Sequence, residues 1–112
     1  MSVTIYHNPK CSKSRQTLEM LRGEGVEPTI VEYLNDMPDA GTLDGIVEML
    51  GVPTRDIVRS KEAAEEGIDA NLDGDALIAA IAAHPRVLQR PIVVNGDKAA
   101  IGRPPENVLA IL

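Results

Sequence analysis

The first 33 residues contain a strand, a helix and a second strand joined by short connections, and this succession constrains the fold more than any other feature. Residues 3–6 and 29–33 are short, rich in β-branched residues and typical of strands. Residues 12–22 between them have the spacing of a helix. One face of that helix is expected to carry Thr17, Leu18 and Leu21. Strand, helix and strand with short links predict a right-handed βαβ unit whose strands are parallel.

The end of the chain predicts a β-hairpin followed by a helix. Strands at 92–94 and 98–101 flank the turn signal Asn95-Gly96. Pro104 and Pro105 then open a last helix. Its inward-facing residues are expected to be Val108, Leu109 and Leu112. Together with the βαβ unit, these elements predict an α/β fold with a four-stranded mixed sheet and flanking helices.

The middle of the chain is predicted to be a helical insertion over about 38–88. Thr42 is expected to cap a first helix, Thr54 a short turn, and an acidic stretch extends to about Asn71. Asp73 or Asp75 then begins a helix that ends at His84-Pro85. The apolar faces of the two helices are Leu43, Ile46, Val47 and Leu50, and Leu77, Ile78 and Ile81. A chain of 112 residues fits one domain, 1–112.

Composition excludes several classes of protein. The net charge of −6 disfavours general nucleic-acid binding, and a chain with two Tyr and no Phe or Trp offers few faces for stacking bases. No apolar run approaches the roughly 20 residues of a membrane span, and the first residues lack the apolar core of a signal peptide. A single cysteine excludes an internal disulfide framework and a zinc cluster. We therefore expect a cytoplasmic protein.

Cys11 stands where the first helix begins, and it is the candidate nucleophile. The free amides and the dipole of a helix start favour an anion, and a cysteine so placed can have its pKa lowered from about 8.5 into the range of about 3.5–7.5. Ser14 can aim its hydroxyl at the sulfur, and His7 is close enough in sequence to modulate it. The neighbouring cations are expected to favour the thiolate as well: Lys10, Lys13 and Arg15. The alternative is an inert core cysteine, against which the polar, cationic neighbours argue.

Three further arginines stand at the ends of predicted elements: Arg59, Arg90 and Arg103. Taken singly, each is most simply a surface residue, and spacing alone does not bring them together. A proline is permitted at the start of a strand, so a cis bond between Arg90 and Pro91 is open. Because the motif is Cys-x-x-Ser, the chain has no resolving cysteine, and any redox cycle needs an outside thiol.

Residues 6–15 resemble the signature H-N-P-x-C-x-x-S-R of the glutaredoxin-coupled arsenate reductase family. Two later pieces match in order, Gln-Arg-Pro-Ile-Val-Val at 89–94 and Gly-Arg-Pro at 102–104, and residues 58–61 resemble a third arginine segment. The similarity covers essentially the whole chain and is to the shorter members of the family. It implies a thioredoxin-like fold with a helical insertion.

The resemblance also implies a chemistry. A cysteine thiolate attacks arsenate or a similar oxyanion, glutathione as co-substrate attacks next, and glutaredoxin helps to release arsenite; no metal and no bound cofactor take part. A thiolate and an arsenate charge repel by about 4 kcal/mol at about 4 Å and an effective dielectric near 20, which forked guanidinium groups can offset. The implied roles are Cys11 as nucleophile; Arg59, Arg90 and Arg103 as oxyanion ligands; His7, Ser14 and Arg15 as thiolate support; and Pro91 as the cis proline.

Three other functions remain open. A relative of the same enzymes could reduce a protein or glutathione mixed disulfide. A regulator similar to the Spx transcription factors would bind RNA polymerase, although Ser14 replaces the second cysteine that many of those proteins carry. A monothiol glutaredoxin would tend to show C-G-F-S, whereas residues 11–14 are C-S-K-S.

Overall fold

The computed structural model describes residues 2–112, and these form two compact units. One unit consists of the residues up to Asp36 together with Arg90–Leu112, and the other is Met37–Gln89. The first unit holds the sheet, and the second is built from helices. The extent of a single domain over 1–112 stays a prediction.

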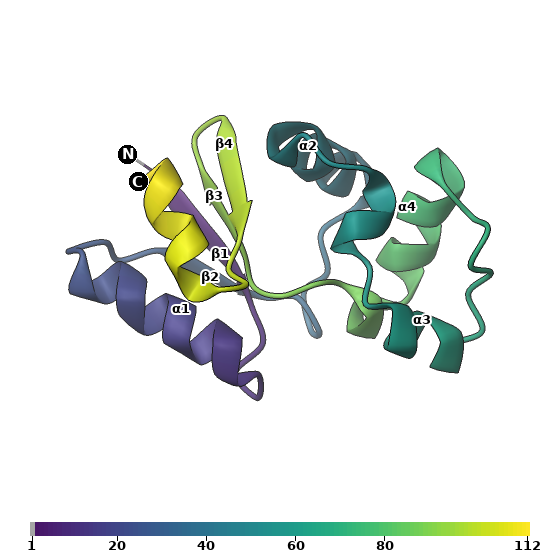
Figure 1. Ribbon diagram of the computed structural model, residues 1–112, viewed down its shortest axis with the longest axis horizontal. Helices are drawn as coiled ribbons and strands as arrows, with labels where there is room; N and C mark the ends of the chain where they lie inside the picture. The colour runs from purple at the N-terminus through teal and green to yellow at the C-terminus, as the bar shows by residue number, and fades with distance from the viewer. Residues whose placement is uncertain (1) are drawn as a thin grey trace. The chain divides into compact units, whose positions relative to one another are not determined.

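A four-stranded mixed sheet forms the centre of the first unit, in the order β2-β1-β3-β4 (Figure 1). The strands are β1 (Val3–His7), β2 (Thr29–Glu32), β3 (Ile92–Asn95) and β4 (Lys98–Ile101). β1 runs parallel to β2 and antiparallel to β3, and β3 runs antiparallel to β4. Both the βαβ start and the mixed sheet are therefore confirmed.

The β3–β4 hairpin turns one residue later than the sequence predicts. Asn95 is still paired with Lys98, so the two central residues of the turn are Gly96 and Asp97. Gly96 has a φ of +63°, which a glycine adopts without steric cost. A glycine at the first central position is the requirement of a type II′ turn, one of the two common two-residue hairpin turns.

One face of the sheet is covered by α1 (Ser12–Gly23) and by the 3-10 helix η3 (Pro105–Ile111), which also pack against each other (Figure 1). Helix α1 buries Thr17 and Leu21 as predicted, with Leu18 partly buried against the core. The core between the sheet and these two helices consists of Val3, Ile5, Leu21, Val93 and Val108.

The last helix faces inward with different residues from those predicted. Val108 is buried as expected, but Leu109 and Leu112 are exposed. The segment is a 3-10 helix with three residues per turn, so the inward row is spaced by three rather than by three and four. That row consists of Pro105 and Val108, which are buried, and Ile111, which is partly buried.

The second unit is held together by the buried faces of α2 (Ala40–Leu50) and α4 (Gly74–Ala83), which pack against each other. The short elements η1 (Thr54–Ile57), α3 (Ser60–Glu65) and η2 (Pro85–Val87) complete it. Its buried apolar residues are Leu43, Ile46, Ile57, Ala63, Leu77, Ile78, Ile81, Val87 and Leu88.

Three details of this unit differ from the prediction. Pro53 is the N-cap residue of η1, so Thr54 is the first residue of that short helix rather than its cap. The cap of α2 is Asp39, whose carboxylate accepts the Thr42 N–H, so Thr42 is inside the helix rather than at its cap. Helix α3 lies within the acidic stretch, where no helix was expected. It buries only Ala63, and a single apolar position produces no periodicity to detect. Asp73 does cap α4, and His84 ends it, as predicted.

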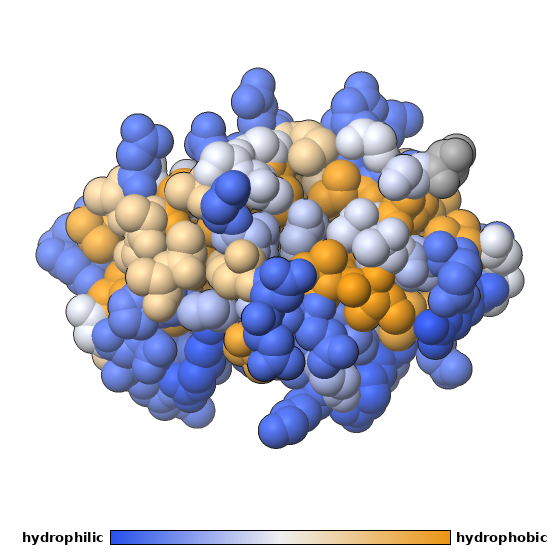
Figure 2. Space-filling model, turned by 180° about the vertical axis from the view of Figure 1, so that it is seen from behind, coloured by the Kyte–Doolittle hydropathy of each residue, from blue (hydrophilic) through white to orange (hydrophobic). Residues whose placement is uncertain are grey.

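No helix within residues 2–112 has both the length and the apolar character needed to cross a membrane. On the face seen in Figure 2, apolar residues gather in patches that hydrophilic side chains interrupt. Ile30 and Leu34 are among the large apolar residues that stay exposed in the first unit.

Candidate active site

Cys11 is the N-cap residue of α1, directly after the turn that follows β1. Its side chain is half-buried. Burial acts to raise the pKa of the thiol, but the backbone N–H groups of Ser14 and Lys13, the charge of Arg103 and a hydrogen bond from Arg90 outweigh it. The net effect is a pKa of Cys11 below its ordinary value, which favours the nucleophilic thiolate.

Arg103 and Arg90 reach the sulfur from the β3–β4 hairpin. The Nη2 of Arg103 donates to Cys11 Sγ at 3.3 Å, and its Nε donates to the carbonyl oxygen of Arg90 at 2.7 Å. Since Ile92 pairs with Ile101, the residues just outside the hairpin are brought together. Each of these two arginines precedes a cis proline, Pro91 and Pro104. Two cations 13 residues apart in sequence thus meet at one thiolate.

Gly102 allows the hairpin to approach α1 this closely. A Cβ at this position would lie 2.6 Å from Thr17 Oγ1 and 2.8 Å from Pro91 Cγ, which is closer than atoms can pack. The Gly102 N–H also donates to the Pro91 carbonyl oxygen at 2.9 Å. A glycine beside Arg103 is therefore a condition for that arginine to reach Cys11.

Ser14 and His7 form a buried pair beside the cysteine. The Ser14 hydroxyl lies 2.6 Å from His7 Nδ1 and accepts the Asn8 N–H at 3.0 Å. The Ser14 hydroxyl was expected to contact the sulfur, but it points toward β1 instead. Ser14 lowers the pKa of Cys11 through its backbone N–H. Burial lowers the pKa of His7, with Glu32 opposing and Arg22 and Arg15 assisting.

The sequence neighbours with positive charge lie on the surface. Lys10, Lys13 and Arg15 are exposed, and Arg15 donates to the Pro9 carbonyl oxygen at 2.9 Å. The cations that lower the pKa of Cys11 are instead the two hairpin arginines. The support that Arg15 is expected to provide to the thiolate stays a prediction.

Arg59 belongs to the second unit, where it is the N-cap residue of α3. Its Nε donates to Glu62 Oε2 at 2.9 Å and its Nη1 to Gln89 Oε1 at 3.2 Å. Its backbone N–H donates to the Val87 carbonyl oxygen at 2.7 Å. Within its own unit the guanidinium is thus held in one orientation, and its part in an oxyanion site stays a prediction.

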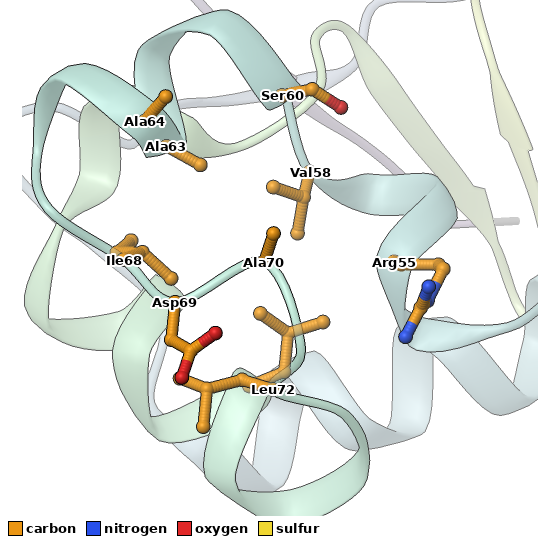
Figure 3. Close-up of a pocket in the computed structure, with 10 residues that line it drawn as sticks. Arg55, Val58, Ser60, Ala63, Ala64, Ile68, Asp69, Ala70 and Leu72 are labelled. Atoms are coloured by element: carbon orange, nitrogen blue, oxygen red, sulfur yellow. The ribbon is translucent and has the colours of Figure 1, made fainter.

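The second unit also contains a cavity of about 160 Å³ (Figure 3). Its lining is mostly apolar, including Val58, Ile68 and Leu72, with Arg55 and Asp69 among the polar side chains. None of the predicted site residues lines it. Among residues 2–112, no group of three His, Cys, Asp or Glu side chains is placed to hold a metal ion.

A thioredoxin-like sheet, with a cysteine of lowered pKa at the start of its first helix and two arginines acting on the sulfur, defines a thiol-dependent oxidoreductase. The chain belongs to the ArsC family, whose model matches residues 6–111.

Several known proteins are similar to this chain over its whole length. An arsenate reductase of Haemophilus influenzae is 47% identical over 100% of both chains. The protein YfgD of Escherichia coli strain K12 is also 47% identical, over 98% of this chain and 96% of that protein. Among solved structures, an arsenate reductase from Vibrio cholerae has a TM-score of 0.93 and 46% identity, covering 100% of this chain and 98% of that one.

Proposed function

We propose that this protein reduces arsenate to arsenite through the thiolate of Cys11. The observation that carries the proposal is the guanidinium of Arg103, which donates to Cys11 Sγ at 3.3 Å. A hydrogen bond from Arg90 also lowers the pKa of this thiol. A cation pair of this kind stabilises the thiolate and attracts a tetrahedral oxyanion to it. Full-length relatives that are arsenate reductases support arsenate as that oxyanion.

The first step joins sulfur to arsenic. The Cys11 thiolate attacks the arsenic(V) of arsenate, and one arsenate oxygen takes up protons and leaves as water. The oxidation state of arsenic does not change in this step. During the attack, Arg90 and Arg103 hold the arsenate oxygens that do not leave, with Arg59 as the third proposed ligand, so that the two anions can approach each other.

Thiols from outside the chain supply the two electrons. Overall, one arsenate and two thiols yield one arsenite, one disulfide and one water, so arsenic gains the two electrons that the sulfurs lose. Because Cys11 is the only cysteine, the attacking thiol must come from outside the chain. From the resemblance to the glutaredoxin-coupled family, we propose that glutathione attacks the adduct and that glutaredoxin assists the release of arsenite. The protein itself needs no metal and no bound cofactor. We place it in the cytoplasm, where thiols are kept reduced.

The test is turnover of arsenate by the purified protein with glutathione, glutaredoxin and an NADPH-coupled glutathione reductase. NADPH consumption that depends on arsenate and disappears in Cys11→Ser supports the proposal. Cleavage of a glutathione mixed disulfide without arsenate turnover would show a thiol reductase with another substrate. Absence of both activities together with binding to RNA polymerase would show a regulator.

The arginines are tested separately by binding. Each single change to alanine at Arg59, Arg90 or Arg103 removes one charge-assisted contact, worth about 1.5–3 kcal/mol, and should weaken arsenate binding about ten- to a hundred-fold. The affinity is measured on Cys11→Ser as the parent, so that no chemistry follows binding. If all three variants bind arsenate like their parent, the proposed oxyanion site is wrong.

A further inference from the structure

Asn8 lies in the signature around Cys11 but receives no role from the sequence, yet each of its polar groups is engaged at the turn that carries the cysteine. Its carbonyl oxygen accepts the Cys11 N–H at 3.0 Å, and its Oδ1 accepts the Lys10 N–H at 3.0 Å. Its N–H donates to Ser14 Oγ at 3.0 Å, and its Nδ2 donates to Tyr33 Oη at 3.4 Å. The side chain is only 8% exposed.

These bonds connect the cysteine to three different parts of the unit. The bonds to Lys10 and Cys11 close the turn itself, in which Pro9 takes the second position, where proline is favoured. The bond to Ser14 fixes the turn to the first turn of α1, whose amides face the sulfur. The bond to Tyr33, which is fully buried, fixes it to the segment that follows β2.

We propose that Asn8 is a positioning residue for Cys11, which holds the sulfur against the first amides of α1 by fixing both ends of the turn between β1 and the helix. The inference rests on the proposed role of Cys11 as the nucleophile. Asn8 does not touch the sulfur, and it acts through the backbone of Cys11 and through Ser14.

A hydrogen bond to a thiolate depends strongly on distance, so a turn that loosens weakens the contact between the sulfur and the helix amides. Asn8→Ala removes the bonds to Lys10 and Tyr33 and leaves the two backbone bonds without support. A loss equivalent to one hydrogen bond corresponds to a rise of about 0.4 to 1 in the pKa of the thiol. At pH values below that pKa, alkylation of Cys11 should slow by about three- to tenfold.

The matched control is Asn95→Ala in the same unit. Asn95 is an equally buried asparagine, 9% exposed, whose Nδ2 donates to the Ile111 carbonyl oxygen at 2.6 Å. Both variants lose buried hydrogen bonds and should unfold at a lower temperature. If Asn8 has a merely structural role, the pKa of the Cys11 thiol should be the same in both variants. If Asn8 positions the cysteine, that pKa should differ from the parent's in Asn8→Ala alone.

The experiment measures the rate of iodoacetamide alkylation against pH for the parent and both variants. We expect the inflection to move upward in Asn8→Ala and to stay in Asn95→Ala. An unchanged inflection in Asn8→Ala, or an equal shift in both, overturns the inference. If Asn8→Ala does not fold, Tyr33→Phe removes the hydroxyl that accepts from Asn8 Nδ2 and keeps the buried ring, and it must move the inflection upward by a smaller amount for the inference to stand. Because alkylation involves no arsenate, a protein that fails to turn over arsenate but shows this shift refutes only the proposed function.

Discussion

Replacing Arg103 by alanine should raise the pKa of the Cys11 thiol by about one unit or more. The two groups are 3.3 Å apart. At that distance, two unit charges attract by about 1.3 kcal/mol in water and by about 5 kcal/mol at an effective dielectric of 20. Both side chains are half-buried, so solvent screening favours the lower part of this range. Since 1.36 kcal/mol corresponds to one pKa unit, a rise of about 1 to 2 units is the reasonable expectation.

The assay is again the pH dependence of alkylation, with thermal unfolding as a check that the variants are folded. Arg103→Lys should have a smaller effect, because it retains the charge but cannot donate to both the sulfur and the Arg90 carbonyl oxygen. Arg22→Ala is the control: this arginine of α1 pairs with Glu27 at 3.0 Å and does not act on Cys11. If Arg103→Ala titrates like the parent, the electrostatic account of the thiolate is refuted.

Three further outcomes are expected. Gly102→Ala places a methyl group 2.6 Å from Thr17 Oγ1 and should cost about 1–3 kcal/mol of stability in denaturant unfolding, with slower alkylation of Cys11. As pH increases from the lowered native pKa of Cys11 to about 8.5, the free energy of unfolding of the parent should rise relative to that of Cys11→Ser. In this pH range the thiol keeps its proton in the unfolded chain but has lost it in the native protein. Equal pH profiles of the two proteins would contradict this expectation. Ile81→Ala, in the buried face of α4, should cost about 2–5 kcal/mol in denaturant unfolding of its unit.

Local patterns predicted most of the framework. The β-branched strands and the Asn95-Gly96 signal placed every strand within one residue of its observed bounds. The apolar spacing of α4 identified its buried face correctly. These elements were predictable because burial of one face imposes a regular period on the sequence itself.

The sequence-based predictions were wrong where tertiary packing decides the spacing of buried residues or the hydrogen-bond partner of a side chain. The segment Pro105–Ile111 tightens into a 3-10 helix against the sheet, so that Val108 is buried as predicted but Ile111 packs beside it in place of Leu109 and Leu112. The Ser14 hydroxyl could bond either to the sulfur or to His7, and the packing of β1 beside α1 places His7 Nδ1 within hydrogen-bond distance. Neither choice is encoded in the spacing of residues along the chain.

The same distinction explains why the cations that matter at Cys11 come from far along the chain. Successive residues of a helix point about 100° apart, and the buried row of α1 runs through Ser14, Thr17 and Leu21. Lys13 and Arg15, on either side of that row, are directed to the surface, so the helix start contributes its backbone amides to the sulfur but not its charged side chains. The cations that act on the half-buried sulfur come from another element, because the paired ends of β3 and β4 bring Arg90 and Arg103 there. The lowered pKa of Cys11 therefore has two sources, the backbone amides of the motif around the cysteine and a contact that spans 92 residues of the chain.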